Sequence, residues 1–220
     1  MGAHALLSAS GSHRWLSCIP SAVLEQNFPD ETSPYAAEGT AAHALAEHKL
    51  RLFLGIPTKP PVSEYDSPEM DEYTDVYVAF ACELIAEARV KSPDAMVLIE
   101  QKLDFSHYVP GGFGTGDLVV AIDGVLHIAD LKYGKGVAVA VEHNPQLMLY
   151  ALGALEAFDF LFDIKSVRMT ICQPRLDSLS TCELSVDELI AWAESELKPK
   201  AELAIKGEGE FAPGEDTCKF

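Results

Sequence analysis

Hydrophobic positions follow a helical period in the first part of the chain and mainly form continuous runs after it. Apolar residues three and four positions apart are typical of helices that cover a core, and short continuous runs are typical of buried strands. We assign the apolar stripe of 68–90, which includes Tyr77, to core packing alone. The patterns predict helices within 8–27, at 40–54, at 68–90, from 144 onward and at 185–205, strands at 95–104, 118–122, 125–129, 165–173 and 180–184, and an extended run at 137–141.

Capping residues mark the expected ends of these helices. Thr40 is an expected N-cap, and Gly55 is expected to end the same helix because glycine readily adopts a left-handed conformation. Ser67 and Asn144 have the short polar side chains that cap the next two helices. Ser185, with a glutamate three residues later, has the pattern of a capping box.

A dipeptide, Asp123-Gly124, separates the two middle strands and is a strong signal for a two-residue hairpin turn. Both turn positions need positive φ, which this pair tolerates. The turn predicts that Ile122 faces Val125 and that residue numbers of all facing pairs add to the same sum. With the strand at 95–104 before it, the hairpin predicts an antiparallel meander of three strands.

The predicted register has a chemical consequence at the far end of the hairpin. Asp117 falls opposite Asp130, and facing side chains have Cβ atoms roughly 4.5–5.5 Å apart. Like charges there are destabilising unless a proton is shared or a cation lies between them. Lys132 follows two residues after Asp130 and lies on the same face. These residues indicate a metal site with a catalytic lysine. The alternative interpretation is that Asp117 and Asp130 are solvated residues at the ends of their strands and that Lys132 is a neighbouring salt-bridge partner.

Two further acidic or imidazole side chains are candidates for the same site. Glu100 follows the apolar run of 95–104 and is placed to project toward the acidic end of the hairpin, although a solvated glutamate is equally consistent with the pattern. His43 and Glu47 share one face of the helix at 40–54. A partly buried histidine bonded to a neighbour is the alternative for His43.

Charge and cysteine content narrow the class of protein. The chain of 220 residues carries a net charge of −18 and has no run of Lys or Arg, which argues against a module that grips duplex phosphates broadly. Any contact with nucleic acid must be local, metal-assisted or supplied by a partner. No apolar run reaches the roughly 18 residues of a membrane span. Five cysteines and no secretory signal predict a reducing compartment, so we expect a cytoplasmic protein without a membrane partner.

Four short motifs occur in an order that is informative as a set. They are Gly-Thr-x-x-His at 39–43, Gly-x-Gly-Asp at 114–117, Asp-x-Lys at 130–132 and Gln-x-x-x-Tyr at 146–150. This order, on the predicted helix, strands and following helix, resembles the RecB-type branch of the PD-(D/E)XK nucleases. It is most similar to phage-associated exonucleases related to the CRISPR-associated iron–sulfur nucleases.

The resemblance implies a fold, an activity and a set of site residues. The implied fold is a mixed α/β (α+β) domain with a PD-(D/E)XK restriction-endonuclease-like core, in which helices flank a central mixed sheet with an antiparallel meander. The implied activity is Mg²⁺- or Mn²⁺-dependent hydrolysis of DNA, as an exonuclease in phage or prophage DNA processing or recombination. Hard oxygen ligands suit either ion, and an imidazole shifts the preference toward Mn²⁺. The implied metal ligands are His43, Asp117, Asp130 and the backbone carbonyl of Leu131, with Glu100 as a further candidate; Asp117, Asp130 and Lys132 are catalytic; Gln146 and Tyr150 position the DNA.

Some relatives carry an iron–sulfur cluster held by four cysteines. Cys18 fits the first ligand position and Cys218 fits the first of three near the C-terminus, but two cysteines cannot supply four thiolates. We therefore expect no assembled cluster here: either the chain is cut short inside a cluster region or this member lacks the cluster. The expected organisation is one nuclease domain over 1–220, with a helical part at 1–92, a catalytic core at 93–206 and a tail at 207–220.

A second function, from a different class, stays open from the sequence. The same fold can serve as a catalytically inactive module that binds DNA ends or proteins of a phage recombination or replication assembly. In either case the expected partners are DNA ends or single strands and proteins of that assembly. The intact set of His43, Asp117, Asp130 and Lys132 favours the enzyme, because an inactive scaffold has no need to oppose two carboxylates.

Overall fold

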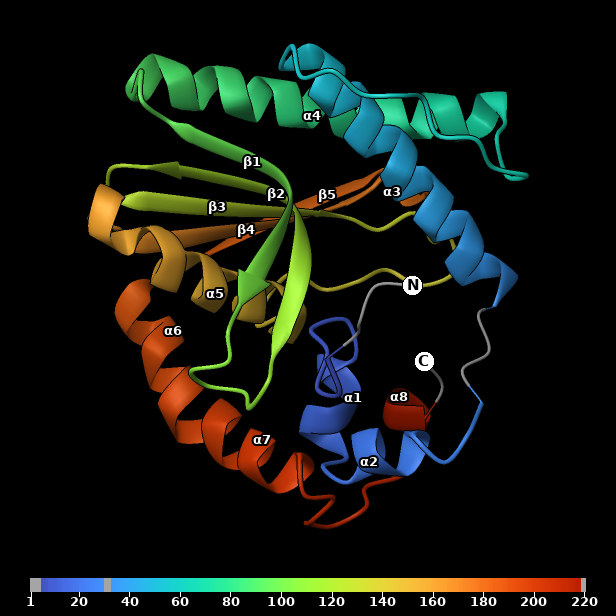
Figure 1. The fold of residues 1–220 in the computed structure, drawn as a ribbon, viewed down its shortest axis with the longest axis vertical. Coiled ribbons are helices and arrows are strands. Elements are labelled where there is room, and N and C mark those ends of the chain that lie inside the picture. Colours follow the sequence, from blue (N-terminus) through green and yellow to red (C-terminus); the bar gives the residue numbers. More distant parts are fainter. Residues whose placement is uncertain (1–4, 30–32, 219–220) are drawn as a thin grey trace.

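A five-stranded mixed sheet forms the centre of the computed structural model, which describes residues 5–29 and 33–218. The strand order is β1-β2-β3-β4-β5, with all neighbours antiparallel except the parallel pair β3–β4 (Figure 1). The predicted mixed sheet with an antiparallel meander and flanking helices is therefore confirmed. The strands are β1 (Met96–Asp104), β2 (Phe113–Ile122), β3 (Val125–Leu131), β4 (Ser166–Gln173) and β5 (Ser178–Ser185).

Helices cover both faces of this sheet (Figure 1). Helices α3 and α4 pack on one face, and α5 and the run from α6 to α7 pack on the other. Helix α5 connects the parallel strands β3 and β4, as a parallel pair requires. The helices are α1 (Ser12–Ser17), α2 (Ser21–Glu25), α3 (Pro34–Phe53), α4 (Pro68–Lys91), α5 (Pro145–Phe162), α6 (Val186–Trp192), α7 (Lys198–Ala204) and α8 (Glu215–Cys218), with a 3₁₀ turn at Pro174–Leu176 and a π-helical turn at Ala193–Leu197.

The predicted start of helix α3 was wrong by six residues. The helix begins at Pro34, and the side chain of Ser33 caps it by accepting a hydrogen bond from the amide of Ala36. Proline at the first helical position and serine before it together form a stronger start signal than Thr40. Thr40 lies inside the helix, where its hydroxyl donates to the carbonyl of Ala36. As a result His43 lies in the body of α3, not in its first turn.

Two other local predictions need correction. The helix expected within 8–27 is divided into α1 and α2, because Pro20 cannot donate an amide hydrogen bond and disfavours helical geometry in the residue before it. The extended run at 137–141 does not join the sheet. Instead, the buried side chain of Gln173 accepts from the amide of Val139 at 2.7 Å and donates to the carbonyl of Val137 at 3.0 Å. These bonds satisfy the backbone groups that a neighbouring strand would otherwise have paired.

The hairpin register predicted from Asp123-Gly124 is confirmed. Ile122 pairs with Val125 and Leu118 with Ala129, so facing residue numbers add to 247 throughout the ladder. Gly124 adopts a φ of 80°, but Asp123 is not among the described residues with positive φ, so only one of the two turn positions has the predicted conformation.

The β1–β2 ladder is interrupted at one position, and beyond it the alternate side chains of β1 point to the opposite face of the sheet. Glu100 has a φ of 50° and stands opposite Asp117 without pairing, although the register is the same on both sides of the break. Leu98 packs toward the α5 side of the sheet, and so does Leu103, five residues later. Regular alternation would put these two leucines on opposite faces. The left-handed residue therefore turns the strand over at the point where the candidate site lies.

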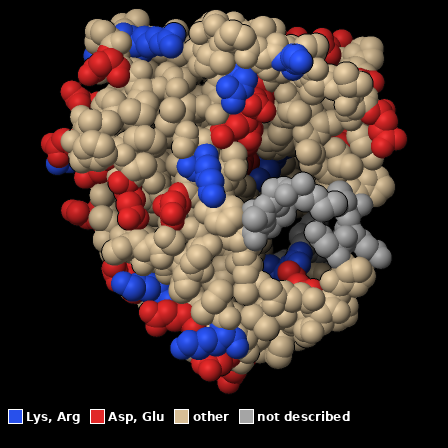
Figure 2. Space-filling model, in the orientation of Figure 1, with Lys and Arg blue, Asp and Glu red and all other residues tan. Residues whose placement is uncertain are grey.

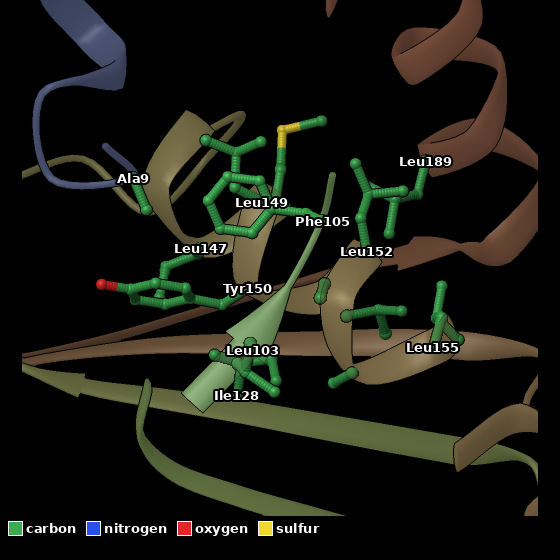
Figure 3. Packing of buried hydrophobic residues seen from close by; sticks show 14 of the residues in the cluster. Ala9, Leu103, Phe105, Ile128, Leu147, Leu149, Tyr150, Leu152, Leu155 and Leu189 are labelled. Carbon is green, nitrogen blue, oxygen red and sulfur yellow. The ribbon is translucent and has the colours of Figure 1, made fainter. Parts of the chain in front are cut away.

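The larger core fills the space between the sheet and α5 (Figure 3). The ring of Tyr150 lies in this core, and its hydroxyl points away from the hydrophobic residues. Strand β2 comes so close to this ring that a Cβ on Gly114 would lie 2.7 Å from Cε1 of Tyr150. The glycine at this position is thus required by packing. Across the described residues, no helix combines the length and apolar character needed to cross a membrane.

Candidate metal centre

Three side chains from three elements meet at the end of the hairpin. They are His43 from α3, Glu100 from β1 and Asp117 from β2, and each offers a ligand atom that lies within 4.8 Å of the other two. Nδ1 of His43 donates a hydrogen bond to Oδ1 of Asp117 at 3.1 Å. One imidazole and two carboxylates form a donor set suited to Mn²⁺ or Mg²⁺. We call these three residues the acidic triad.

A second group adjoins the triad and contains the predicted lysine. Nζ of Lys132 lies 3.0 Å from Oδ2 of Asp130 and donates to Oε1 of Gln146 at 2.7 Å. The amide nitrogen of Gln146 in turn donates to Oδ1 of Asp130 and to the hydroxyl of Tyr150, both at 3.1 Å. These four residues, here called the lysine network, fix the ammonium group between the end of β3 and the start of α5.

The two groups are connected through the backbone of Leu131. Its amide donates to Oδ2 of Asp117 at 2.7 Å, which holds the carboxylate between β3 and the histidine. Leu131 therefore contributes its backbone amide, as a donor to Asp117, whereas the sequence predicted its backbone carbonyl as a metal ligand. Asp130, also a predicted ligand, directs its carboxylate to the lysine network. Glu100, ranked last among the candidates from the sequence, completes the triad.

The pKa values at the site reflect three neighbouring acids, Glu100 and Asp117 of the triad and Asp130 of the lysine network. Burial lowers the pKa of His43, but the charge and hydrogen bond of Asp117, with the charges of Asp130 and Glu100, outweigh burial and raise it to about 9. Burial and the charge of Asp117 raise the pKa of Glu100 to about 7. Burial raises the pKa of Asp130 despite the opposing charge of Lys132. An added cation would relieve this repulsion, so the residues present fit a divalent metal.

Metal binding is expected to be strongly dependent on pH, because His43 and Glu100 must lose protons to act as ligands. Both pKa values are raised, so these groups stabilise the metal-free fold at low pH. That contribution is lost as pH rises from 4.5 through about 7 for Glu100 and from 6.5 through about 9 for His43. We therefore expect the rise in Tm produced by Mn²⁺, relative to EDTA, to grow between pH 6.5 and 9. Thermal unfolding over this range measures it, and a pH-independent increment would contradict the assignment of His43.

His43 of the triad and Lys132 of the lysine network line a cavity of about 810 Å³. Leu131, Lys135 and Arg175 line it as well. On the face shown in Figure 2, Lys and Arg side chains are scattered among acidic and uncharged residues, without a continuous basic surface. Contact with a polyanion on this face would therefore be local, as the net charge of −18 predicts.

The two cysteines singled out in the sequence lie on neighbouring elements. Cys18 is buried just after α1, and its Sγ accepts a hydrogen bond from the amide of Ala212 at 3.3 Å. Cys218 is exposed on α8, which lies beside α1 (Figure 1). The C-terminal segment thus folds back onto the N-terminal helices.

One residue at the site was missed. Tyr77 belongs to the apolar stripe of α4, yet it lines the same small cavity as His43, Glu100 and Asp117. The only signal in the sequence was a hydroxyl on an otherwise apolar stripe, and the stripe by itself indicates no more than burial.

Comparison with known proteins places the chain in a family. Residues 4–220 match the model of the family DUF2800, described as "Protein of unknown function", so the chain belongs to this family. Among solved structures, one described as "Crystal structure of SSO0001" is 12% identical and has a TM-score of 0.29. The match covers 89% of this chain and 87% of that chain. At this TM-score the likeness carries no argument about fold or function.

Proposed function

We propose that this protein is a divalent-metal-dependent DNA nuclease with a PD-(D/E)XK core, acting as an exonuclease in the processing or recombination of phage or prophage DNA. The observation that carries the proposal is the convergence of the acidic triad beside Lys132, with His43 and Lys132 lining one cavity. The order of elements supports it as well. Helix α3, the meander β1–β2–β3, helix α5 and strand β4 follow the arrangement on which the sequence resemblance rests.

The triad would hold the Mg²⁺ or Mn²⁺ ion, through Nδ1 of His43 and the carboxylates of Glu100 and Asp117. When bound, the ion would activate water and neutralise charge that develops on the phosphate. Holding it requires the proton of His43 to leave, which breaks the present bond to Asp117. Leu131 keeps the other oxygen of Asp117 in place through its amide.

Lys132 would act on the phosphate during hydrolysis. In that reaction a water oxygen bonds to phosphorus, the bond from phosphorus to the leaving sugar oxygen breaks, and the leaving oxygen takes up a proton. A lysine ammonium has three N–H donors; Lys132 donates one to Gln146 and forms an ion pair with Asp130. Because Lys132 also lines the cavity, a remaining donor can reach a phosphate oxygen there. A donor fixed beforehand at that oxygen stabilises the charge of the transition state.

Gln146 and Tyr150 would position the lysine and the DNA backbone beside it. Tyr150 is 5% exposed, and its hydroxyl accepts from Gln146, so its contribution passes through Gln146. Lys135 and Arg175 supply further positive charge along the cavity, although Glu38 pairs with Arg175 at 3.0 Å. This small number of cationic side chains suits a substrate that the protein contacts only locally, at the end of a DNA strand.

A direct assay tests the proposal with the wild-type protein. Single- and double-stranded DNA labelled at one end is incubated in Mn²⁺, Mg²⁺ or EDTA, and the products are separated by length. We expect cleavage with either metal and none with EDTA, with products shortened stepwise from an end. A ladder of internal cuts would support nuclease activity but show an endonuclease instead of an exonuclease. Lack of cleavage under all conditions would contradict the proposed activity.

A second candidate function is an inactive module of the same fold that binds DNA ends or partner proteins of a phage assembly, and the net charge of −18 favours the protein partners within it. The two candidates differ in one measurable respect. The module would bind DNA in Mn²⁺ and leave it intact over hours, whereas the enzyme would shorten it. Binding and cleavage measured on the same labelled strand separate them.

A further inference from the structure

The hydroxyl of Tyr77 is a buried polar group without a hydrogen-bond partner among the described residues. Tyr77 lies on α4 and is 1% exposed. Its ring packs in the core between the sheet and helices α3 and α4, with neighbours that include Ala81, Leu118 and Leu131. An unpaired buried hydroxyl is destabilising, because it leaves water without gaining another hydrogen-bond partner. A phenylalanine would fill the same space without that cost, so the hydroxyl calls for an explanation.

Tyr77 lies beside the acidic triad. It lines the same small cavity as His43, Glu100 and Asp117. A phenol carries one O–H donor, so beside carboxylate oxygens the Tyr77 side chain can donate a hydrogen bond.

We propose that Tyr77 is a positioning residue for the divalent ion, whose hydroxyl donates a hydrogen bond to an oxygen ligand of that ion. This inference rests on the proposed function, because it assigns the triad to a metal. Metal ligands are usually oriented by such outer hydrogen bonds, and their loss typically weakens metal affinity about 10- to 100-fold. Helix α4 would thus contribute to a site that the motifs assign to α3 and the sheet.

The variant Tyr77→Phe tests the inference, because it removes the hydroxyl and keeps the ring. We expect the Kd for Mn²⁺, measured by isothermal titration, to rise about tenfold or more. The Tm of the variant in EDTA is expected to equal or exceed that of the wild type, because an unpaired polar group has been removed. Tyr73→Phe is the matched control, since Tyr73 lies on the same helix and packs against the ring of Tyr133 outside the triad. The control is expected to bind Mn²⁺ like the wild type.

The outcomes separate the inference from the proposed function. A lower Tm in EDTA with an unchanged Kd for Mn²⁺ would show a structural hydroxyl and overturn the inference alone. A folded wild type that does not bind Mn²⁺ would overturn the metal assignment and, with it, the role of Tyr77. Weaker Mn²⁺ binding in Tyr77→Phe supports the inference even if no DNA is cleaved, and in that case the nuclease proposal is what fails.

Discussion

Replacing Asp117 by asparagine is expected to abolish both Mn²⁺-induced stabilisation and metal-dependent cleavage. Asp117 contacts His43 and the amide of Leu131, and it is the member of the triad that connects the helix to both strands of the hairpin. Loss of a metal ion removes several kcal/mol of transition-state stabilisation. We therefore expect cleavage to fall by at least about 10³-fold, measured as initial rates on labelled DNA together with Tm in Mn²⁺ and in EDTA.

The control for this variant is Asp123→Asn. Asp123 is an exposed aspartate in the β2–β3 turn, at the opposite end of the hairpin from the triad. The variant Asp123→Asn makes the same chemical change and should keep the wild-type rise in Tm with Mn²⁺. If Asp117→Asn kept the full metal-induced rise in Tm, the triad would not be the metal site.

Replacing Lys132 by methionine is expected to separate catalysis from metal binding. Nζ of Lys132 contacts Asp130 and Gln146 and is outside the triad, so the affinity for Mn²⁺ should stay close to that of the wild type. Removing a fixed donor from the transition state typically lowers kcat about 10²- to 10³-fold. The variant will also be less stable, because Asp130 is buried and loses its cation. Rates are therefore compared at a temperature where both proteins are folded.

Lys165→Met serves as the control for the lysine variant. Lys165 is 72% exposed and pairs with Asp163 between α5 and β4, away from the cavity. The variant Lys165→Met removes the same charge and should keep the wild-type kcat. A Lys132→Met protein that binds Mn²⁺ and cleaves at the wild-type rate would show that the lysine has a structural role only.

Features set by local sequence could be predicted. The turn at Asp123-Gly124 determines the hairpin register by itself, because a two-residue loop leaves one way to align the strands. That register was enough to place Asp117 and Asp130 at one end of the sheet. The start of α3 could also have been read from the sequence, since Ser33-Pro34 is a start signal of the usual kind.

Features set by long-range packing could not be predicted. Glu100 adopts a φ of 50° that its own sequence does not require, and that conformation turns β1 over at the triad. A non-glycine residue in this region costs about 1–3 kcal/mol and is often found at functional sites. Tyr77 belongs to an apolar stripe, and only the packing of α4 on the sheet brings it to the cavity that Glu100 and Asp117 also line.

The rate of DNA cleavage by the wild type, Asp130→Ala and Lys132→Ala tests the central claim most directly. The three proteins are compared on end-labelled DNA in Mn²⁺ and in EDTA, after Tm measurements show that each is folded. The account predicts cleavage by the wild type in Mn²⁺ alone, and loss of that cleavage in both variants. Cleavage that persists in EDTA or in both variants, or a folded wild type that leaves DNA intact in Mn²⁺, would contradict it.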